Sequence, residues 1–343
     1  MDFHTDMRIV ELDSFEAAVP VRPDEEDEVK RTYMTLFTHE SGFARLGGMS
    51  YVFKAYSHTG KEFAVKRLLI RENVSDIVSL SAVDEQRLVR MRVDSFYEEY
   101  RNQLLVSNLR GFPKLYGFGM IGDDPLIVME WVEGLSLREL ARRFDGMSPC
   151  QRGPFVARMG LDVLSVLDNT SRLDVTFVHR DLTPSNIMVR TDQTSVEEQA
   201  KLGCFDVCLV DFGSAATISA SEARFTMNTQ IWRMGTPEYA PPEMLTQDIP
   251  FVADMRASRA VDVFALCSVL YELYAGHTPW RIAENPHKSA YLVKVESPPE
   301  RLKPVCDVDD VLVDAIMAGL RIDQGDRPDA SALSAVLAQY LAG

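Results

Sequence analysis

The hydrophobic pattern of this chain changes character once, near residues 130–135. Before that point, turn signals separate short runs rich in β-branched and aromatic residues, as in "GMSYVFKAYS", "KEFAVKRLLI", "PKLYGFGMI" and "PLIVMEWVEG". After it, helical signals dominate, and the longest runs lie at about 152–172, 258–276, 308–321 and 329–342. The 343 residues are enough for two lobes, each with its own core. The pattern predicts an α+β chain with a small strand-rich lobe, at about 36–130, and a larger helical lobe, at about 133–343.

Residues 1–35 precede the first strand run and are mixed in character. They carry the acidic run "DEEDE" at positions 24–28. Because runs of like charge are usually solvated, this pattern predicts an exposed, acidic N-terminal arm. A partner-binding arm is the alternative. Residues 71–90 are polar and irregular, whereas the following "VDSFYEEYRNQLLVSNL" predicts a helix.

Charge and composition limit the classes of partner. The formal net charge is −15 at pH 7, which argues against broad binding to nucleic acid or to anionic membranes. There is no run of 18 or more uncharged apolar residues, so no membrane span is predicted, and the N-terminal residues lack the pattern of a signal peptide. The five cysteines, at positions 150, 204, 208, 267 and 306, show no framework and no paired zinc motif. We therefore expect free thiols and a cytoplasmic protein.

The stretch "FVHRDLTPSNIMVR", residues 177–190, places an acid and an amide five positions apart between two apolar borders. Asp181 could accept a proton from an attacking hydroxyl. Asn186 offers a neutral oxygen to a hard cation, and Asp211 follows the short apolar strand of "CLVDFGSA". A carboxylate and an amide oxygen suit Mg²⁺ that holds a nucleoside triphosphate. Each piece alone is also compatible with a simple turn or strand end.

Two further features point to phosphate binding. Gly47 and Gly48 separate two strand runs, where glycines let backbone N–H groups approach a phosphate, although a tight hairpin turn uses the same residues. Lys66 follows an apolar alternation in "FAVK". A lysine that binds phosphate needs a carboxylate to orient it, and Glu98 and Glu99 on the predicted helix are the candidates.

Taken in order, these motifs resemble the eukaryotic-like, or Hanks-type, serine/threonine protein kinases, over about residues 36–340. The resemblance implies the bilobal protein-kinase fold. It also implies transfer of phosphate from ATP, with Mg²⁺, to serine or threonine hydroxyls of protein substrates. By resemblance, Asp181 is the catalytic base, and Asn186 and Asp211 are the Mg²⁺ ligands.

The same resemblance assigns residues around the nucleotide. Lys66 is assigned to the α- and β-phosphates, and it pairs with Glu99 because Phe96 and Tyr100 flank Glu99 as in the family pattern. Met129 resembles the residue that limits the depth of the adenine pocket. The residues expected to line the ATP site are Gly47, Gly48, Met49, Ser50, Val52, Ala64, Lys66, Glu130, Val132 and Met188.

The resemblance continues downstream. "GTPEYAPPE" matches the substrate loop and its closing motif, and Thr236 within it is the mark of serine/threonine kinases. Glu243 is expected to pair with Arg327, and Asp262 to anchor the catalytic loop. Arg180, just before the base, implies activation by a phosphate within the segment that follows "DFG". The candidate phosphorylation sites are Thr229, Thr226, Ser221 and Ser219.

The sequence departs from the family at several points. Thr183 stands where these kinases usually carry a lysine that contacts the γ-phosphate. If nothing compensates, the loss of that cation slows transfer by about 10²–10³-fold. Arg45 and Ser50 occupy glycine positions of the phosphate loop. Two segments are longer than usual, at about 71–90 and 191–203, and the second is expected to be an exposed hairpin.

Three functions remain open from the sequence. The complete motif set favours an active serine/threonine protein kinase. Thr183, and the replacement of two phosphate-loop glycines by Arg45 and Ser50, favour a pseudokinase, which would act as a binding scaffold. A small-molecule phosphotransferase shares the acid, amide and metal-binding acid, but the "GTPEY" loop indicates a peptide substrate. The acidic surface weakly favours basic substrate segments, and the sequence implies no particular oligomeric state or input signal.

Overall fold

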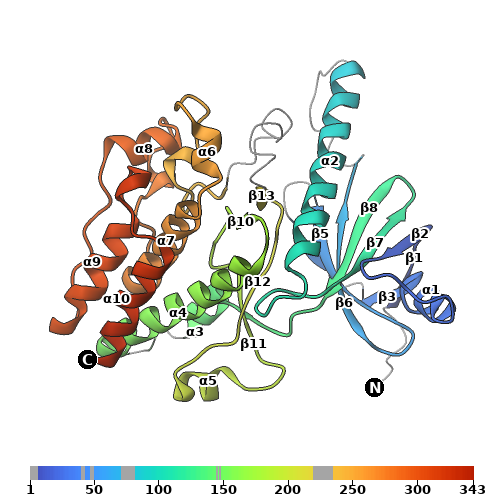
Figure 1. Ribbon diagram of the computed structural model, residues 1–343, viewed down its shortest axis with the longest axis horizontal. Coiled ribbons are helices and arrows are strands. Elements are labelled where there is room, and N and C mark those ends of the chain that lie inside the picture. The colour runs from blue at the N-terminus through green and yellow to red at the C-terminus, as the bar shows by residue number, and fades with distance from the viewer. Residues whose placement is uncertain are drawn as a thin grey trace. The chain divides into compact units, whose positions relative to one another are not determined.

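The chain divides into two compact units. Figure 1 shows the computed structural model, in which residues 7–39, 43–46, 50–70, 82–143, 146, 148–218 and 235–343 are described. The N-terminal unit comprises Met1–Asn108 and Pro113–Val132. The C-terminal unit comprises Leu109–Phe112 and Glu133–Gly343. The first unit is built on a sheet and the second is mostly helical, so the predicted α+β architecture is confirmed.

An eight-stranded antiparallel sheet forms the N-terminal unit. The strand order is β1-β3-β5-β6-β8-β7-β2, and β4 pairs with β5. The strands are β1 (Met7–Glu11), β2 (Ser14–Ala17), β3 (Thr35–His39), β4 (Phe43–Leu46), β5 (Ser50–Tyr56), β6 (Glu62–Leu68), β7 (Leu115–Ile121) and β8 (Asp124–Glu130). Its helices are α1 (Glu26–Tyr33) and α2 (Ala82–Val106). The two hairpins expected from the alternating runs are therefore present as β5–β6 and β7–β8.

Apolar side chains cover both faces of this sheet. Successive residues of a strand point to opposite faces, so Phe63 and Val65 enter one core while their neighbours face the other side. On that other side, Ile127 packs with Phe96 and Phe118 in a cluster that joins α2 to the sheet. The alternation along β6 thus buries Phe63 and Val65 in one core and directs Ala64 and Lys66 to the opposite face of the sheet.

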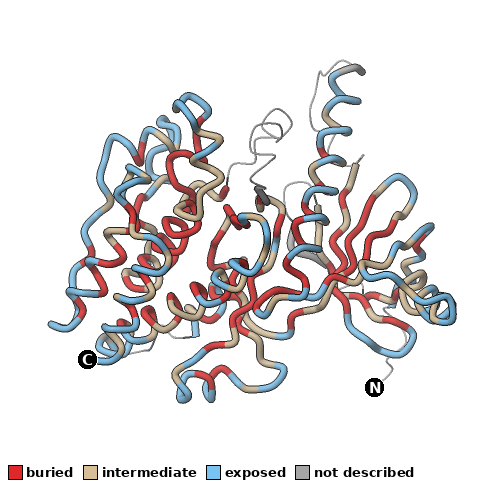
Figure 2. Tube along the Cα trace, viewed as in Figure 1, coloured by how far each residue is buried: buried red, intermediate tan, exposed pale blue. Residues whose placement is uncertain are grey.

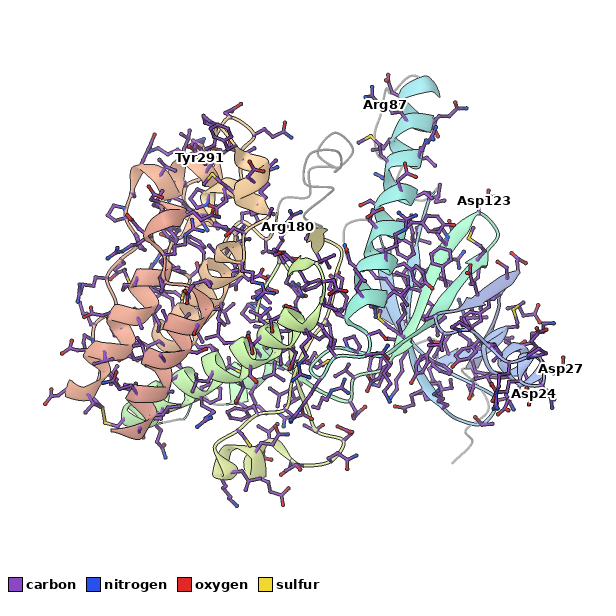
Figure 3. All side chains as sticks on the ribbon, viewed as in Figure 1. Asp24, Asp27, Arg87, Asp123, Arg180 and Tyr291 are labelled. Atoms are coloured by element: carbon purple, nitrogen blue, oxygen red, sulfur yellow. A yellow bond between two sulfur atoms is a disulfide. The ribbon has the colours of Figure 1, made fainter. Side chains whose placement is uncertain are left out.

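Residues 7–33 belong to this structure, so the prediction of a solvated N-terminal arm is wrong for them. β1 pairs with β3, and β2 pairs with β7. Phe15 and Tyr33 join the core, and their rings stack with centroids 4.5 Å apart. The acidic run instead begins α1, where the positive end of the helix dipole favours carboxylates. Asp24 and Asp27 lie at the outer edge of the unit (Figure 3).

The C-terminal unit is mostly helical. Its α-helices are α3 (Leu137–Arg143), α4 (Pro149–Asn169), α5 (Val196–Leu202), α6 (Val252–Arg256), α7 (Ala260–Ala275), α8 (Ala290–Glu296), α9 (Asp310–Gly319) and α10 (Ala330–Ala342). Its strands are β9 (Gly134–Ser136), β10 (Thr176–Val178), β11 (Ile187–Arg190), β12 (Val207–Leu209) and β13 (Ala216–Ile218). α7 is apolar on all sides and contacts both α4 and α9, so it is the central helix, and Figure 2 shows it almost entirely buried.

Local capping signals explain several helix boundaries. Ser136 and Glu139 form a capping box at the start of α3: the Ser136 N–H donates to the Glu139 carboxylate at 2.8 Å, and the Glu139 N–H donates to Ser136 Oγ at 3.3 Å. α7 ends at Gly276, whose φ of 79° lies in the left-handed region that glycine adopts without strain. The helical runs predicted in this part of the chain are present as α4, α7, α9 and α10.

Two local predictions were wrong. α2 begins at Ala82, so residues 82–90 are helical and not irregular. The segment 191–203, expected to be a hairpin, contains helix α5. Ser195 and Glu198 form a capping box at its start, and Gly203 ends it with a φ of 67°. These cap residues were visible in the sequence, and they outweighed the turn residues around them.

A disulfide joins Cys150 to Cys306, so the prediction of five free thiols is wrong for this pair. The two residues are 156 positions apart in the sequence, and their Cα atoms are 5.9 Å apart. Cys150 lies in the first turn of α4 and Cys306 precedes α9. Nothing in the spacing of the cysteines indicates that these two segments meet. The expectation of free thiols therefore no longer supports a location in a reducing compartment.

Candidate functional site

Lys66 of β6 and Glu99 of α2 form a buried ion pair in the N-terminal unit. Only 7% and 4% of the two side chains are exposed. β6 directs Lys66 toward α2 because Val65 occupies the opposite core, and α2 presents Glu99 one turn after the buried Phe96. Glu98, the alternative partner, is 61% exposed and forms a surface ion pair instead. A carboxylate that neutralises and orients a buried lysine makes that lysine a fixed cation, which suits phosphate binding.

The residues next to Lys66 fit the expected nucleotide face. Val52 lies directly opposite Lys66 on β5, and Ala64 lies two positions before it on β6, so the three share one face of the sheet. Ala64 pairs with Met129 of β8. The side-chain amide of Gln103 lies 3.1 Å from the Met129 sulfur and fixes that side chain from α2.

The other residues assigned to the ATP site are distributed over both units. Ser50 begins β5, and Glu130 ends β8 with its carboxylate accepting a hydrogen bond from the Lys114 N–H at 2.9 Å. Val132 is buried after β8, and Met188 lies on β11 of the C-terminal unit. Several predicted residues lie outside the described part of the chain, namely Gly47, Gly48, Met49, Ser219, Ser221, Thr226 and Thr229.

A buried carboxylate of α7 anchors the catalytic loop (residues 179–186). The two carboxylate oxygens of Asp262 accept the backbone N–H groups of His179 and Arg180, both at 2.8 Å. Burial raises the pKa of Asp262, and the neighbouring His179 and Arg180 oppose this rise. Arg180, labelled in Figure 3, has a φ of 67°, which is uncommon for a non-glycine residue. The hydrogen bonds to Asp262 hold the loop in this conformation, as the resemblance implied.

Arg180 is itself held inside the C-terminal unit. Its Nε donates to the carbonyl of Arg256 at 2.9 Å, and the Arg256 Nε donates to the carbonyl of Glu243 at 2.7 Å. Burial lowers the pKa of Arg180 to about 10, and Asp262 opposes the change. The guanidinium is therefore still charged at neutral pH, on the residue that directly precedes Asp181.

Asp181 and the two expected metal ligands lie together at one end of the β11–β12 pair. The Asn186 side-chain NH₂ donates to the Asp181 carbonyl at 2.9 Å and to its carboxylate at 3.3 Å. Because the NH₂ group faces Asp181, the amide oxygen of Asn186 points away from it and is available to a cation. The Val210 N–H donates to the Asn186 carbonyl at 2.9 Å, which places the following residue, Asp211, beside Asn186. Asp211 is exposed and has a φ of 65°.

Thr236 holds Asp181 from the substrate loop (residues 235–243). Its backbone N–H and its hydroxyl both donate to Asp181 Oδ1 at 2.9 Å. Gly235 permits this close approach, because a Cβ at that position would lie 2.9 Å from the Arg180 carbonyl oxygen. Thr183 is 4% exposed and brings no charge to the loop. Thr236 therefore supplies the hydrogen bonds that orient the carboxylate from this side.

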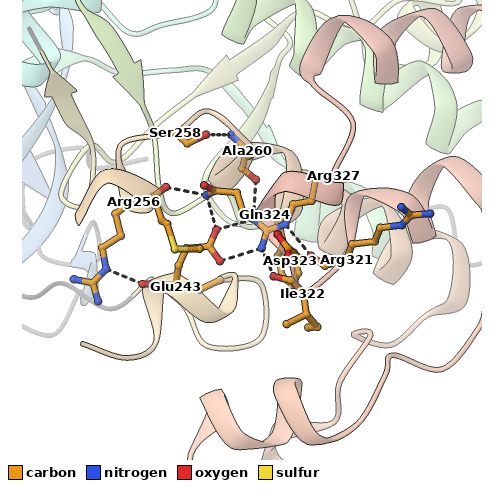
Figure 4. Close-up of polar contacts among 12 residues, drawn as sticks. Glu243, Arg256, Ser258, Ala260, Arg321, Ile322, Asp323, Gln324 and Arg327 are labelled. Carbon is orange, nitrogen blue, oxygen red and sulfur yellow. Dashed lines mark hydrogen bonds and ion pairs between the residues drawn. The ribbon is translucent and has the colours of Figure 1, made fainter. Parts of the chain in front are cut away.

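Glu243 ends the substrate loop and pairs with Arg327, as predicted (Figure 4). Both side chains are almost fully buried, and the two N–O contacts of this bidentate pair are 2.6 Å and 3.0 Å. Gln324 also donates to the Glu243 carboxylate, at 2.9 Å. The remaining donors of Arg327 bond the carbonyls of Arg321, Ile322 and Ala260. All five N–H groups of the guanidinium are thus satisfied, which is the condition for a buried charge to be tolerated.

Lys294 of α8 supports the same loop from another side, and sequence reasoning missed it. The side chain is fully buried. Its ammonium donates to the carbonyl of Ala240 at 2.7 Å and to that of Glu238 at 3.2 Å. It also lies 4.9 Å from the ring centroid of Trp280 and 5.1 Å from that of Phe264. Lys294 therefore fixes the backbone of the substrate loop through main-chain carbonyls and two aromatic rings.

The stability of the protein is expected to depend on pH through Lys294. Burial lowers the pKa of Lys294 from 10.5 to about 7, Glu238 and Glu243 oppose this shift, and Arg327 adds to it. Between about pH 7 and 10, the unfolded chain therefore holds a proton that the folded chain has lost, so the free energy of unfolding rises with pH. The difference in unfolding free energy between the wild type and Lys294→Met should rise by about 1 kcal/mol per pH unit in this window, measured by urea denaturation.

Lys288→Met is the matched control for this measurement. Lys288 is 52% exposed and forms a surface pair with Glu296 at 2.6 Å. The control should differ from the wild type by an amount that does not change with pH in the same window. A pH-independent difference for Lys294→Met would contradict the assignment of a lowered pKa to this lysine.

Comparison with known proteins accords with this geometry. A family model described as "Protein kinase domain" matches residues 46–337, from the end of β4 into α10. The chain belongs to the protein kinase family. The match spans both the Lys66–Glu99 pair of the N-terminal unit and the loop of the C-terminal unit that carries Asp181.

Several relatives of this chain are named serine/threonine-protein kinases. It is 32% identical over 203 residues to the serine/threonine-protein kinase PknL of Mycobacterium tuberculosis, a match that covers 58% of this chain and 41% of PknL. It is 29% identical over 308 residues to AfsK of Streptomyces coelicolor, which covers 87% of this chain and 31% of AfsK. PkaB of the same organism is 32% identical over 223 residues, with coverage of 64% and 46%. In each case, the match spans less than half of the relative's length.

Proposed function

We propose that this protein is an active serine/threonine protein kinase. The observation that carries the proposal is the hydrogen-bonded set of Asp181, Asn186 and Thr236, with Asp211 next to Asn186. An acid held by a substrate loop on one side and by an amide on the other is arranged to receive a hydroxyl group. Since the chain spans less than half of its relatives, its activity and its protein substrates are proposals.

Each residue of the site has a defined task in this proposal. Asp181 accepts the proton of the serine or threonine hydroxyl as that oxygen attacks the γ-phosphate of ATP. Thr236 and Asn186 keep its carboxylate oriented, so that little reorganisation is needed when the substrate arrives. Lys66, oriented by Glu99, binds oxygens of the α- and β-phosphates of the same nucleotide.

The donor set also fits Mg²⁺. Asn186 offers an amide oxygen and Asp211 a carboxylate, and both are hard oxygen ligands of the kind that Mg²⁺ prefers. We propose that these two residues hold Mg²⁺, which neutralises charge on the triphosphate when it is bound. The adenine end of ATP would lie against Val52, Ala64, Glu130, Val132 and Met188.

Thr183 is the observation that favours the scaffold alternative. It is buried and uncharged where the family usually has a lysine, so one cation is missing from the developing charge on the γ-phosphate. The base, both metal ligands and the Lys66–Glu99 pair are nevertheless present. Positioning and metal binding carry most of this reaction, so we propose a slower enzyme and not an inactive one.

One assay separates the candidate functions. The protein is incubated with γ-labelled Mg-ATP, with and without a generic protein substrate, beside Asp181→Asn. Transfer to serine or threonine of a protein that is lost in the variant supports the kinase. Retained ATP binding without any transfer supports the scaffold, and transfer only to a small metabolite supports a small-molecule phosphotransferase.

Two features of the chain bear on where the protein is located. A search of the described residues finds no helix with both the length and the apolar character needed to cross a bilayer. We propose that the protein has no nucleic-acid partners, because its net charge of −15 repels polyanions. The disulfide between Cys150 and Cys306 argues against the expected cytoplasmic location, because such bonds are uncommon in a reducing compartment.

A further inference from the structure

Arg138 is an exposed cation whose guanidinium is held in place by two hydroxyl groups. It lies in the first turn of α3. Its Nε donates to Ser185 Oγ at 2.9 Å, and one NH₂ group donates to the Tyr239 hydroxyl at 3.1 Å. Among the described residues, no Asp or Glu oxygen lies within 4.0 Å of its guanidinium. Its backbone N–H also donates to the carbonyl of Pro184 at 2.9 Å, so both ends of the residue are fixed.

Tyr239 links Arg138 to a carboxylate without neutralising either charge. The Tyr239 hydroxyl donates to Glu272 at 2.6 Å and accepts the hydrogen bond from Arg138. Burial raises the pKa of Tyr239, and Glu272 raises it further, so the phenol stays neutral at physiological pH. The guanidinium therefore keeps its full charge and has two neutral hydroxyls as its hydrogen-bond acceptors.

Two segments that touch the proposed base hold Arg138. Ser185 precedes Asn186, whose side chain bonds Asp181. Tyr239 lies three residues after Thr236, which donates two hydrogen bonds to Asp181 Oδ1. A peptide that brings its hydroxyl to Asp181 must carry its neighbouring residues over the surface that these two segments form. Arg138 stands on that surface, with its remaining N–H groups available.

We propose that Arg138 selects substrates by binding an aspartate or glutamate close to the phosphorylated residue. This inference rests on the proposed kinase activity. The guanidinium has five N–H donors, and its two intramolecular hydrogen bonds leave enough of them for a carboxylate. Because the rotamer is already fixed, the substrate does not have to order the side chain on binding. One residue of extended chain spans about 3.3 Å, so the four positions on either side of the acceptor sample about 13 Å of peptide in each direction.

This selectivity is opposite in sign to that expected from the whole chain. The net charge of −15 favours basic segments at long range. Contact selectivity is decided by the group that the peptide touches, and that group is a cation here. The two effects act at different steps, because the overall field affects encounter and Arg138 affects the bound complex.

The test uses the full chain and a set of threonine peptides. Glu, Gln or Lys is placed singly at each of the four positions before and after the acceptor, and KM and kcat are measured for each peptide. For the wild type, we expect one position at which Glu lowers KM about three- to tenfold relative to Gln, with little change in kcat. The preference should disappear in Arg138→Gln and persist, more weakly, in Arg138→Lys. In Arg138→Glu, the preferred residue at the same peptide position should be Lys instead of Glu.

Arg142→Gln is the matched control, because Arg142 is exposed in the last turn of the same helix. It should keep the wild-type preference. A purely structural role for Arg138 would lower kcat for all peptides equally and leave the Glu-to-Gln ratio unchanged, and this result would overturn the inference. Transfer by the wild type with no acidic preference at any position would also overturn it while leaving the proposed function intact. Absence of transfer to every peptide and to generic protein substrates would overturn both.

Discussion

Replacing Asp181 with asparagine is expected to lower kcat by about 10²–10⁴-fold, with a much smaller change in KM. Asparagine has the same shape and keeps an oxygen that can accept the two hydrogen bonds from Thr236. The variant should therefore fold normally and still bind nucleotide. In the proposed mechanism, Asp181 removes the proton from the attacking hydroxyl, so the loss should appear in the chemical step. Steady-state transfer from labelled Mg-ATP to a protein substrate measures it.

Asp174→Asn is the control for Asp181→Asn. Asp174 is an exposed acid shortly before β10 in the same unit, so the change in net charge is identical. Its kcat should equal that of the wild type. An Asp181→Asn variant with wild-type kcat would show that another residue, or none, acts as the base.

Replacing Glu243 with glutamine should cost about 3–5 kcal/mol of unfolding free energy. The change leaves the Arg327 guanidinium buried and charged with its bidentate partner removed. The new amide also turns an N–H group toward a cation that can only donate hydrogen bonds. Urea denaturation of the two proteins, with the slope of the transition compared, measures the difference.

A double variant separates the lost pair from a general loss of packing. Glu243→Gln with Arg327→Met removes both charges, so its unfolding free energy should lie well above the value expected from the sum of the two single variants. Asp314→Asn is the surface control: Asp314 pairs with Arg301 at 2.7 Å, and both side chains are more than half exposed. Its stability should change little. Strict additivity of the two buried substitutions would contradict the account of this pair.

The strands and helices that carry the site could be predicted where a local signal decides the structure. Alternation along β6 puts Val65 in one core and Lys66 on the other face, and it is visible in the sequence. The start of α3 is also marked locally, because Ser136 and Glu139 have the spacing of a capping box. The residues alone left Glu98 and Glu99 open, and the family pattern of Phe96 and Tyr100 around Glu99 favoured Glu99, which is the acid that pairs with Lys66.

Features that depend on distant segments could not be predicted. Phe15 and Tyr33 gave no sign that they enter the core, because the sheet face they cover is formed by strands far along the chain. Cys150 and Cys306 meet only when α4 and the segment before α9 are brought together. Lys294 binds main-chain carbonyls, which every residue type offers, so its role has no sequence pattern.

We propose that Lys66 of the N-terminal unit and Asp211 of the C-terminal unit act on one nucleotide in one chain. Lys66→Met and Asp211→Asn each remove one of these two groups, and phosphate transfer is measured for the wild type, for each variant and for an equimolar mixture of the two variants. The wild type should phosphorylate serine or threonine, and the rate of transfer by each variant should be lower by at least about 10²-fold. The mixture should be no more active than the two variants measured separately. Full transfer by either variant, or restored transfer in the mixture, would contradict this account.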